Sequence, residues 1–323
     1  MSQIMLIQAI NQALREELLR DENVFLIGED LHTGTFGQTK GIFEEFGPER
    51  VVSTPISEAA FTGISTGAAI AGLRPVVEYM VSNFMYVAMD QLVNQVGKLR
   101  YMYGGQINIP IVFKALNMGG GAAAQHSDNS ADYFLHAVGF KVVMPSTPYD
   151  AKGLLKSAIR DDNPVIFYEE FKTFMAKGEV PDEDYVVPIG KGDIKKEGND
   201  VTIVAVGYPR VLASSVAEKL EKEEGISVEV VDARSLYPID EDLILESVKK
   251  TGRLVTLDDA PINGSFASEI AALVAEKGYS YLKAPIKRVT RIKVPVPHSK
   301  IEEEYVLLNE AKVINAVKDV VNY

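Results

Sequence analysis

The sequence predicts an α/β protein of two domains, each built on a mainly parallel β-sheet covered by helices. Short apolar runs alternate with longer amphipathic stretches along most of the chain, as in repeated strand–helix units. The alternation breaks over residues 181–200, where Pro, Gly and charged residues are frequent. At 323 residues the chain also exceeds the roughly 100–200 residues of one domain. We therefore expect domains at 1–180 and 201–323, joined by a linker at 181–200.

The first domain is expected to begin with a helix that Ser2 caps, because Ile7, Ile10, Leu14 and Leu18 follow helical spacing. Strands and helices then alternate, which favours parallel pairing through helical crossovers. The expected strands begin or lie at 24–27, 51–52, 75–79, 109–115, 141–144 and 163–167. The expected helices cover 57–73, 84–102 and 148–160.

The second domain repeats the same alternation. Its expected strands are 201–206, 227–231, 254–257 and 287–289. Its expected helices are 211–223, 241–250, 265–277 and 310–321.

Two helix starts have signals of their own. Thr147 can cap the helix at 148–160, and Pro148 suits its first position because the missing N–H would be unpaired there anyway. Asp240 is expected to open the helix at 241–250.

Composition and charge exclude several classes of protein. The formal net charge of −12, from 45 acidic and 33 basic residues, argues against a nucleic-acid groove and against binding to anionic membranes. With no cysteine, the chain has no disulfide, no thiolate nucleophile and no Cys-ligated metal. The N-terminus shows no signal-peptide pattern, and no apolar run approaches the ~20 residues that span a bilayer. We expect a soluble cytoplasmic protein.

Glycine motifs give no support for nucleotide binding. Neither G-x-G-x-x-G nor G-x-x-x-x-G-K-[ST] occurs. The run Gly119-Gly120-Gly121 precedes Gln125-His126, and by itself it is typical of an ordinary flexible loop.

Glu58 lies at a predicted strand-to-helix junction and has two interpretations. A carboxylate in the first turn of a helix complements the helix dipole and needs no further role. However, Ile56, Ala59 and Phe61 surround it with apolar side chains, and the predicted helix is nearly uncharged as far as Arg74. A carboxylate desolvated in this way is a candidate for acid–base catalysis.

Of the four histidines, His126 is the best candidate for function, because Gln125, Ser127 and Asp128 can orient its imidazole. His136 lies in a helical stretch and is more typical of a structural histidine. The spacing of the two does not suit a zinc site.

The turn Asp161-Asp162-Asn163-Pro164 also has two interpretations. It is typical of a solvated turn before a strand, but its carboxylate, amide and carbonyl oxygens could bind a hard cation. No Ser-His-Asp arrangement can be assembled from spacing.

Taken together, four stretches resemble the beta chain of the thiamine-diphosphate-dependent decarboxylating component of 2-oxo acid dehydrogenase complexes. They are Val24–Asp30 (VFLIGED), Ser53–Gly63 (STPISEAAFTG), Gln125–Ser127 (QHS) with Gly139–Pro145 (GFKVVMP), and Ala151–Pro164 (AKGLLKSAIRDDNP). The resemblance spans essentially the whole chain, and the combination is far more specific than any single motif.

The resemblance implies a transketolase-like pyrimidine-binding domain followed by a transketolase C-terminal domain. It implies that Glu58 hydrogen-bonds N1′ of the aminopyrimidine and thereby activates thiamine diphosphate. It also implies that Phe84 stacks near this ring, where the family varies between Phe and Tyr, and that Ile56 and Met80 line its pocket. His126 should face the lipoyl arm of a dihydrolipoyl acyltransferase and act as a proton donor in acyl transfer.

Two further roles follow from the resemblance. Glu29 should belong to an acidic route between paired active sites. Ile111, Ala158, Asp161 and Asn163 match a structural potassium site, partly through backbone carbonyls.

One motif of thiamine enzymes is missing. The Gly-Asp-Gly that, with a later Asn, holds Mg²⁺ against the diphosphate does not occur, and Gly28-Glu29-Asp30 lacks the second glycine. The resemblance therefore implies an alpha chain that supplies Mg²⁺ and the diphosphate site, in an alpha2-beta2 heterotetramer.

The substrate is expected to be a 2-oxo acid, oxidatively decarboxylated, with branched-chain acids favoured by kinship. The kinship comes from C-terminal stretches remote from the substrate, namely Lys250–Leu254, Phe266–Ile270, Lys283–Ile286 and Pro297-His298. Pyruvate and acetoin remain alternatives, as do the C-terminal half of a split transketolase and a non-catalytic module on the same fold.

Overall fold

The computed structural model describes all residues 1–323, and the chain divides into two compact units. The first unit contains Met1–Asn117 and Tyr133–Ile189. The second contains Met118–Asp132 and Gly190–Tyr323. Each unit is α/β, as the sequence predicts, but the short segment 118–132 belongs to the second unit although it interrupts the first. Nothing in the local sequence pattern indicated this exchange.

The first unit is built on a parallel sheet in the order β6-β7-β5-β4-β2-β3. Its strands are β2 (Val24–Glu29), β3 (Val51–Thr54), β4 (Arg74–Tyr79), β5 (Val112–Asn117), β6 (Lys141–Val143) and β7 (Val165–Glu170). Each of these strands carries an apolar run, because both faces of a parallel sheet are covered by helices.

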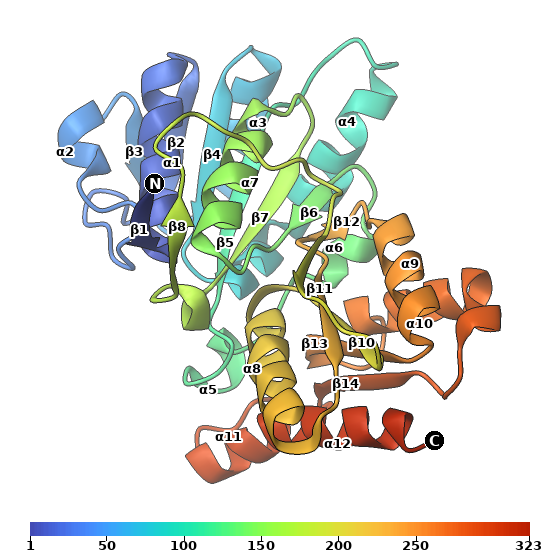
Figure 1. Cartoon of the computed structure of the whole chain (residues 1–323). Coiled ribbons are helices and arrows are strands. Elements are labelled where there is room, and N and C mark those ends of the chain that lie inside the picture. Colours follow the sequence, from blue (N-terminus) through green and yellow to red (C-terminus); the bar gives the residue numbers. More distant parts are fainter. The chain divides into compact units, whose positions relative to one another are not determined.

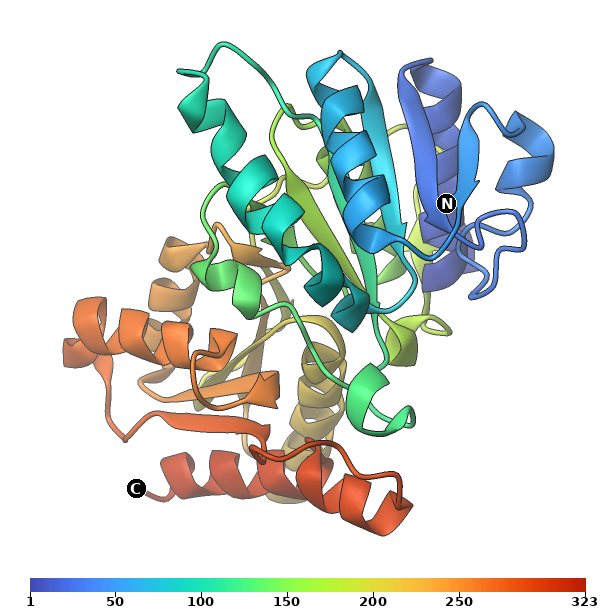
Figure 2. The same ribbon diagram turned by 180° about the vertical axis from the view of Figure 1, so that it is seen from behind.

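Helices cover both faces of this sheet. α1 (Leu6–Arg20) and α7 (Pro148–Arg160) lie against one face (Figure 1), and α3 (Glu58–Ile70) and α4 (Gly97–Met102) cover the other (Figure 2). Shorter helices complete the unit: α2 (Ile42–Phe46), α6 (Tyr133–His136) and the 3-10 helix η3 (Phe171–Thr173). α7 begins as predicted, since Thr147 Oγ1 accepts the N–H of Asp150 at 3.1 Å and Pro148 takes the first position.

The predicted start of the first helix is wrong. Ser2 lies in a strand, β1 (Ser2–Met5), which pairs antiparallel with β8 (Lys177–Val180). The helix begins only at Leu6, where the Gln8 side chain accepts the backbone N–H of Met5 at 2.9 Å. The pairing partner of β1 is far away in sequence, so the local helical spacing could not reveal it.

The helix predicted at 84–102 is three consecutive helical segments instead. A 3-10 helix, η1 (Ser82–Ala88), is followed by a π-helix, η2 (Asp90–Val96), and then by α4. Phe84 lies in the first of these, with its N–H bonded to the carbonyl of Val81 at 3.0 Å. Departures from α-helical geometry of this kind often mark functional segments.

The second unit contains a sheet in the order β14-β13-β10-β11-β9. Its strands are β9 (Asp193–Lys196), β10 (Val201–Ala205), β11 (Val228–Asp232), β13 (Leu254–Pro261) and β14 (Lys287–Arg291), with β12 (Ser235–Tyr237) as a further short strand. Its helices are α5 (Ala123–His126), α8 (Gly207–Glu224), α9 (Glu241–Thr251), α10 (Phe266–Lys277), η4 (Tyr279–Tyr281), α11 (Lys300–Val306) and α12 (Glu310–Val321). All pairs are parallel except β9 with β11, which is antiparallel. β9 lies within the stretch 181–200 that the sequence suggested as a linker.

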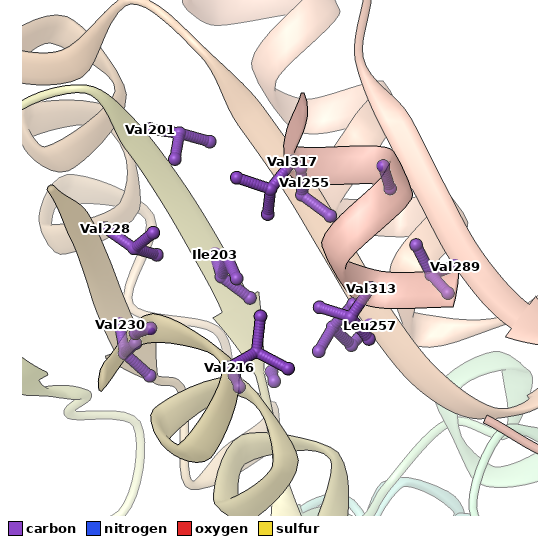
Figure 3. Packing of buried hydrophobic residues seen from close by; sticks show 14 of the residues in the cluster. Val201, Ile203, Val216, Val228, Val230, Val255, Leu257, Val289, Val313 and Val317 are labelled. Atoms are coloured by element: carbon purple, nitrogen blue, oxygen red, sulfur yellow. The ribbon is translucent and has the colours of Figure 1, made fainter. Parts of the chain in front are cut away.

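A valine-rich core fills the space between this sheet and helices α8 and α12 (Figure 3). Val201 and Ile203 of β10 face Val216 of α8 and Val317 of α12, and all four are fully buried. Burial of one such side chain stabilises a fold by roughly 1.5–3 kcal/mol. The core therefore stabilises β10 and the neighbouring strands, to which the connecting segments are attached.

Asp240 precedes α9 as predicted, but its carboxylate does not cap that helix. It accepts the N–H of Gly192 at 3.1 Å instead. No helix in the chain combines the length and apolar content that crossing a membrane requires.

Candidate active-site residues

Glu58 and its predicted neighbours gather at the carboxyl edge of β3, β2 and β4. The parallel register pairs Glu29 with Thr54 and Gly28 with Glu78, so these strands end side by side. The chain leaves β3 at Thr54 and enters α3 at Glu58. Ligand sites of open parallel sheets form at this edge.

Glu58 is a buried carboxylate in the first turn of α3, with 7% of its surface exposed. Its backbone carbonyl accepts the hydroxyl of Thr62 at 2.5 Å, and Ser57 precedes the helix without a side-chain cap. We find no hydrogen bond from the chain to the Glu58 carboxylate. Its oxygens are not among the enclosed side-chain atoms that lack a partner, so they remain accessible to a hydrogen-bond donor from a bound group.

Glu29 ends β2 beside Glu58 and is also buried. Burial raises the pKa of Glu29, and the nearby Glu58 raises it further. The N–H of Ser57 donates to its carboxylate, whereas Oε1 has no partner. Glu29 therefore holds a proton more readily than an ordinary glutamate does.

The three apolar residues predicted for the cofactor pocket lie on the connections that leave β3 and β4. Ile56 is 82% exposed between β3 and α3, while Met80 and Phe84 follow β4 and are half-buried. The same edge of the sheet thus has apolar side chains next to a buried carboxylate. A binding site for an aromatic ring with polar atoms at its edge requires both.

Sequence reasoning missed a buried ion triad in the same unit. Lys114 Nζ lies 2.6 Å from Glu78 Oε2 and 2.6 Å from Glu169 Oε1, and all three side chains are buried. Burial raises the pKa of Glu169 to about 7 and raises that of Glu78, and the ammonium of Lys114 opposes both shifts. For Lys114, burial works against the charge, but the two glutamates outweigh it and raise its pKa. The triad therefore contains an exchangeable proton near neutral pH.

Glu78 of the triad and Glu29 line the same small cavity. The space measures about 10 Å³, and its lining includes Glu29, Gln38, Glu78 and Met80. It has room for about one water molecule. Gly28 is required at this point, because a Cβ there would lie 2.4 Å from the carbonyl oxygen of Glu78. A charged residue inside each of three apolar strands was the signal that could have revealed the triad.

His126 ends the short helix α5 in the second unit and is exposed. Ala123, which starts α5, has φ = +54°, a left-handed conformation that costs a non-glycine residue energy. His136 is also exposed and belongs to the first unit. The two histidines thus belong to different units, and only His126 lies in the irregular segment that follows the glycines.

The residues matched to a potassium site lie around the turn between α7 and β7. The Ala158 carbonyl accepts the N–H of Asp161 at 3.3 Å, and the Ile111 carbonyl accepts the N–H of Val165 at 3.0 Å. The Asn163 side-chain oxygen accepts from Arg100 at 3.0 Å. Several of these oxygen atoms therefore already have protein donors.

The Asp161 carboxylate is likewise engaged. It pairs with Lys141 and accepts the N–H of Asn163 at 2.9 Å. Burial opposes its ionisation, but the hydrogen bonds from Lys141 and Asn163 outweigh burial and lower its pKa. The Asp161 carboxylate is therefore already occupied by donors of the chain. No group of three or more His, Asp or Glu side chains in the chain is arranged to hold a metal ion.

Comparison with protein families finds two matches that cover most of the chain. Residues 2–173 match the pyrimidine-binding domain of transketolase, and residues 190–313 match the transketolase C-terminal domain. The boundary between the matches falls close to the end of the first structural unit at Ile189.

Individual relatives point to a narrower group. The chain is 46% identical to the beta subunit of acetoin:2,6-dichlorophenolindophenol oxidoreductase of Bacillus subtilis, over 95% of this chain and 94% of that protein. It is 42% identical to the beta subunit of 2-oxoisovalerate dehydrogenase of the same species, with full coverage of both. It is 45% identical to the beta subunit of the pyruvate dehydrogenase E1 component of Rhizobium meliloti, over 97% of this chain and 69% of that protein.

A solved structure is similar over its whole length. A split-gene transketolase, described as an inactive beta4 tetramer, superimposes with a TM-score of 0.81 at 25% identity, covering 99% of this chain and 98% of that one.

Proposed function

Since the chain belongs to the transketolase-fold family of beta subunits of 2-oxo acid dehydrogenases, we propose that Glu58 activates thiamine diphosphate for oxidative decarboxylation of a 2-oxo acid. The observation that carries this proposal is Glu58 itself, a residue with 7% of its surface exposed that starts α3 at the carboxyl edge of the sheet. A carboxylate at this place can accept a hydrogen bond from the protonated N1′ of an aminopyrimidine.

The residues around Glu58 fit this part of the cofactor. Ile56, Met80 and Phe84 offer apolar surface to an aromatic ring, with Phe84 as the stacking residue. When bound, thiamine diphosphate supplies the nucleophilic carbon and the electron sink that decarboxylation needs. The protein's part is to hold the N1′ proton at the Glu58 carboxylate and to exclude water from that contact.

Glu29 supports the role of Glu58 because its raised pKa favours binding of a proton next to Glu58. Burial and the nearby Glu58 both raise the pKa of Glu29, so Glu29 holds a proton more readily than an ordinary glutamate does. We propose that Glu29 is part of an acidic route that passes protons to and from Glu58. The small cavity shared by Glu29 and Glu78 is consistent with such an exchange.

We assign His126 to the second half-reaction, transfer of the acyl group to a lipoyl carrier held by a dihydrolipoyl acyltransferase. Opening a lipoyl disulfide requires a proton for the departing sulfur. His126 is exposed at the end of α5, where its imidazole can provide that proton.

The beta subunit is expected to work only with an alpha subunit, in an alpha2-beta2 heterotetramer. The support is the missing Gly-Asp-Gly, which leaves Mg²⁺ and the diphosphate to the alpha chain. A potassium ion held by backbone carbonyls near Ile111, Ala158, Asp161 and Asn163 would brace the α7–β7 turn, and no catalytic step depends on it. Cytoplasmic location likewise stays a prediction.

For the substrate we propose branched-chain 2-oxo acids, on the C-terminal stretches that resemble branched-chain beta chains. Relatives named for acetoin, 2-oxoisovalerate and pyruvate have similar identities to this chain, between 42% and 46%. Pyruvate and acetoin are therefore the competing substrates.

A second candidate function is the C-terminal half of a split transketolase, which the similarity to the solved beta4 tetramer favours. Both functions use Glu58 in the same way. They differ in the acceptor, because a transketolase transfers its fragment to a sugar phosphate and not to a lipoyl group.

The test is to purify the chain together with its alpha partner and assay a panel of 2-oxo acids with a lipoyl domain as acceptor. We expect reductive acylation of the lipoyl domain, fastest with branched-chain substrates. Fastest turnover with pyruvate or acetoin would overturn the substrate assignment alone. Activity with sugar phosphates and none with the lipoyl domain would overturn the proposed function.

A further inference from the structure

The segment that carries His126 is held by a buried arginine of the second unit. We propose that Arg291, through its ion pair with Asp259, is a positioning residue that sets the location of His126 for acyl transfer. This proposal rests on the role proposed above for His126. It uses only contacts within the second unit, to which residues 118–132 belong.

The segment needs external support because three flexible glycines precede Ala123, whose left-handed backbone conformation costs energy. Gly119, Gly120 and Gly121 have φ values of +66°, +126° and +75°, and Ala123 follows at +54°. Alanine avoids this left-handed conformation unless neighbouring contacts impose it. α5 is also a single short turn, too short to be stable alone.

Ser127 is the point at which the segment is fixed. This residue directly follows His126 but is fully buried, whereas His126 is exposed. Its Oγ accepts the N–H of Ala122 at 3.2 Å, and its N–H donates to the carbonyl of Ala123 at 3.2 Å. Its carbonyl accepts a hydrogen bond from Arg291 Nη1 at 2.5 Å. The turn is therefore closed on itself, and the Ser127 carbonyl attaches it to Arg291.

Arg291 is well placed to fix that carbonyl. It ends β14, with 5% of its surface exposed, and its guanidinium grips Asp259 of β13 with two bonds of 2.7 Å, from Nε and from Nη2. A paired fork of this kind fixes the plane of the guanidinium, so the remaining Nη1 points in one direction. Lysine cannot bond both Asp259 oxygens and the Ser127 carbonyl in the same planar arrangement.

Other contacts hold the same end of the segment to the same strand. Asn129 Nδ2 donates to the Asp259 backbone carbonyl at 3.3 Å, and Asn129 Oδ1 accepts the N–H of Ala131 at 3.0 Å. The Asp132 carboxylate accepts the N–H of Phe266, the first residue of α10, at 3.1 Å. Residues 127–132 are thus tied to the sheet core of the unit.

The other end of the segment is tied separately, to α11. The N–H of Gly121 donates to the Glu303 carboxylate, and Gly120 packs against Leu307. α5 and α11 are labelled in Figure 1. His126 therefore lies between two anchors, and Arg291 binds the residue directly beside it.

The test uses Arg291→Met and Arg291→Lys in the intact complex with the alpha subunit. Arg253→Met is the matched control, since Arg253 is also bonded to backbone carbonyls of the second unit, those of Asp200 and Val320, but does not contact the segment. Two rates are compared: acylation of a lipoyl domain, and decarboxylation with an artificial electron acceptor.

We expect both Arg291 variants to lose lipoyl acylation by roughly tenfold to a hundredfold, because small displacements of a catalytic group have effects of that size. Artificial-acceptor decarboxylation should stay within about twofold in the same variants, and Arg253→Met should change neither rate by more than that. Hydrogen exchange of residues 121–131 should accelerate in the Arg291 variants while α10 and β10 keep their protection. Combining Arg291→Met with His126→Ala should cost no more acylation than His126→Ala alone.

Unchanged exchange in residues 121–131 of Arg291→Met would overturn the proposal, as would equal losses in the two assays. Should Arg291→Met fail to assemble, Arg291→Lys decides by the same two measurements, since it keeps a positive charge beside Asp259. If His126→Ala itself leaves acylation unchanged, the role of His126 fails. Exchange in Arg291→Lys then still reports separately whether Arg291 orders the segment.

Discussion

The two candidate catalytic residues are positioned in opposite ways. Glu58 starts a helix at the edge of a parallel sheet, where the register of β2, β3 and β4 fixes it. His126 ends a single turn of helix in a strained segment, where individual polar contacts fix it. The first position is a consequence of the fold itself, whereas the second depends on a few side chains that the fold does not require.

This difference suits the two proposed tasks. A residue that meets a tightly bound cofactor benefits from a rigid frame, because misplacement by a fraction of a bond length is costly. A residue that meets a carrier protein lies on a connecting segment, as binding residues on a rigid scaffold commonly do. Changes at Glu58 should therefore affect every reaction of the enzyme, and changes around His126 only one of them.

The largest expected effect is that of Glu58→Ala. Turnover with both the lipoyl domain and an artificial acceptor should fall on the order of a thousandfold, because the cofactor loses its acid–base partner. Steady-state kinetics and size-exclusion chromatography of the assembled complex measure this. Glu17→Gln, which changes a buried carboxylate of α1 paired with Arg160 outside the site, serves as the control and should lose far less. Wild-type turnover of Glu58→Ala in an intact complex would refute the role of Glu58.

The next effect is that of His126→Ala. Lipoyl acylation should fall on the order of a hundredfold, since the proton for the departing sulfur is lost. Decarboxylation with an artificial acceptor should be nearly unchanged. Parallel kinetics with the two acceptors make the comparison, and His136→Ala is the matched control. Equal losses in both assays would contradict a role specific to acyl transfer.

A smaller effect concerns the dependence of stability on pH. It compares one carboxyl group from each unit. Burial raises the pKa of both Glu169 and Asp132 to about 7. The unfolded chain releases these protons at the ordinary, lower pKa, so each group stabilises the folded state below that value. The contribution is lost as the pH rises through about 7.

Glu169→Gln and Asp132→Asn should therefore each weaken the fall in melting temperature between pH 5 and 8, by roughly 2–4 °C. Thermal unfolding of the assembled complex across this pH range provides the measurement. A pH profile identical to that of the wild type in both variants would contradict the assignment of these protons.

The smallest effect is loss of one helix cap in each unit. Thr147→Ala removes the cap of α7, and Ser265→Ala removes the Oγ that accepts the N–H of Ser268 at the start of α10. Each should destabilise its unit by about 1 kcal/mol. Only Ser265→Ala should also speed hydrogen exchange near Asp132, because α10 begins at the Phe266 N–H that holds Asp132. Equal exchange in the two variants would show that the His126 segment does not depend on α10.

The same contrast explains what could be predicted from the sequence. The strand and helix pattern around Glu58 is local, and Thr147 with Pro148 even indicated the correct first residue of α7. Ser2 was assigned wrongly because its partner strand, β8, is almost the whole first unit away in sequence. The segment 118–132 could not be assigned to the second unit for the same reason, since Arg291 and Asp259 are more than a hundred residues distant.

Charged residues in otherwise apolar strands are the sequence signal of the buried ion triad. Glu78, Lys114 and Glu169 each interrupt a run of β-forming residues, and together they make the most buried ion cluster of the first unit. Each lies in a different strand, and only the sheet order β7-β5-β4 brings them together. The roles assigned to Ile56, Met80, Phe84 and the residues of the potassium site remain predictions.

The most direct measurement of the central claim is the exchange of the thiazolium C2 proton of thiamine diphosphate bound to the assembled complex. The exchange can be followed by acid quenching in deuterium oxide and NMR, without substrate or lipoyl carrier. If Glu58 activates the cofactor, Glu58→Gln should slow this exchange on the order of a hundredfold while the cofactor remains bound. Exchange at the wild-type rate in a fully loaded Glu58→Gln complex would contradict the account.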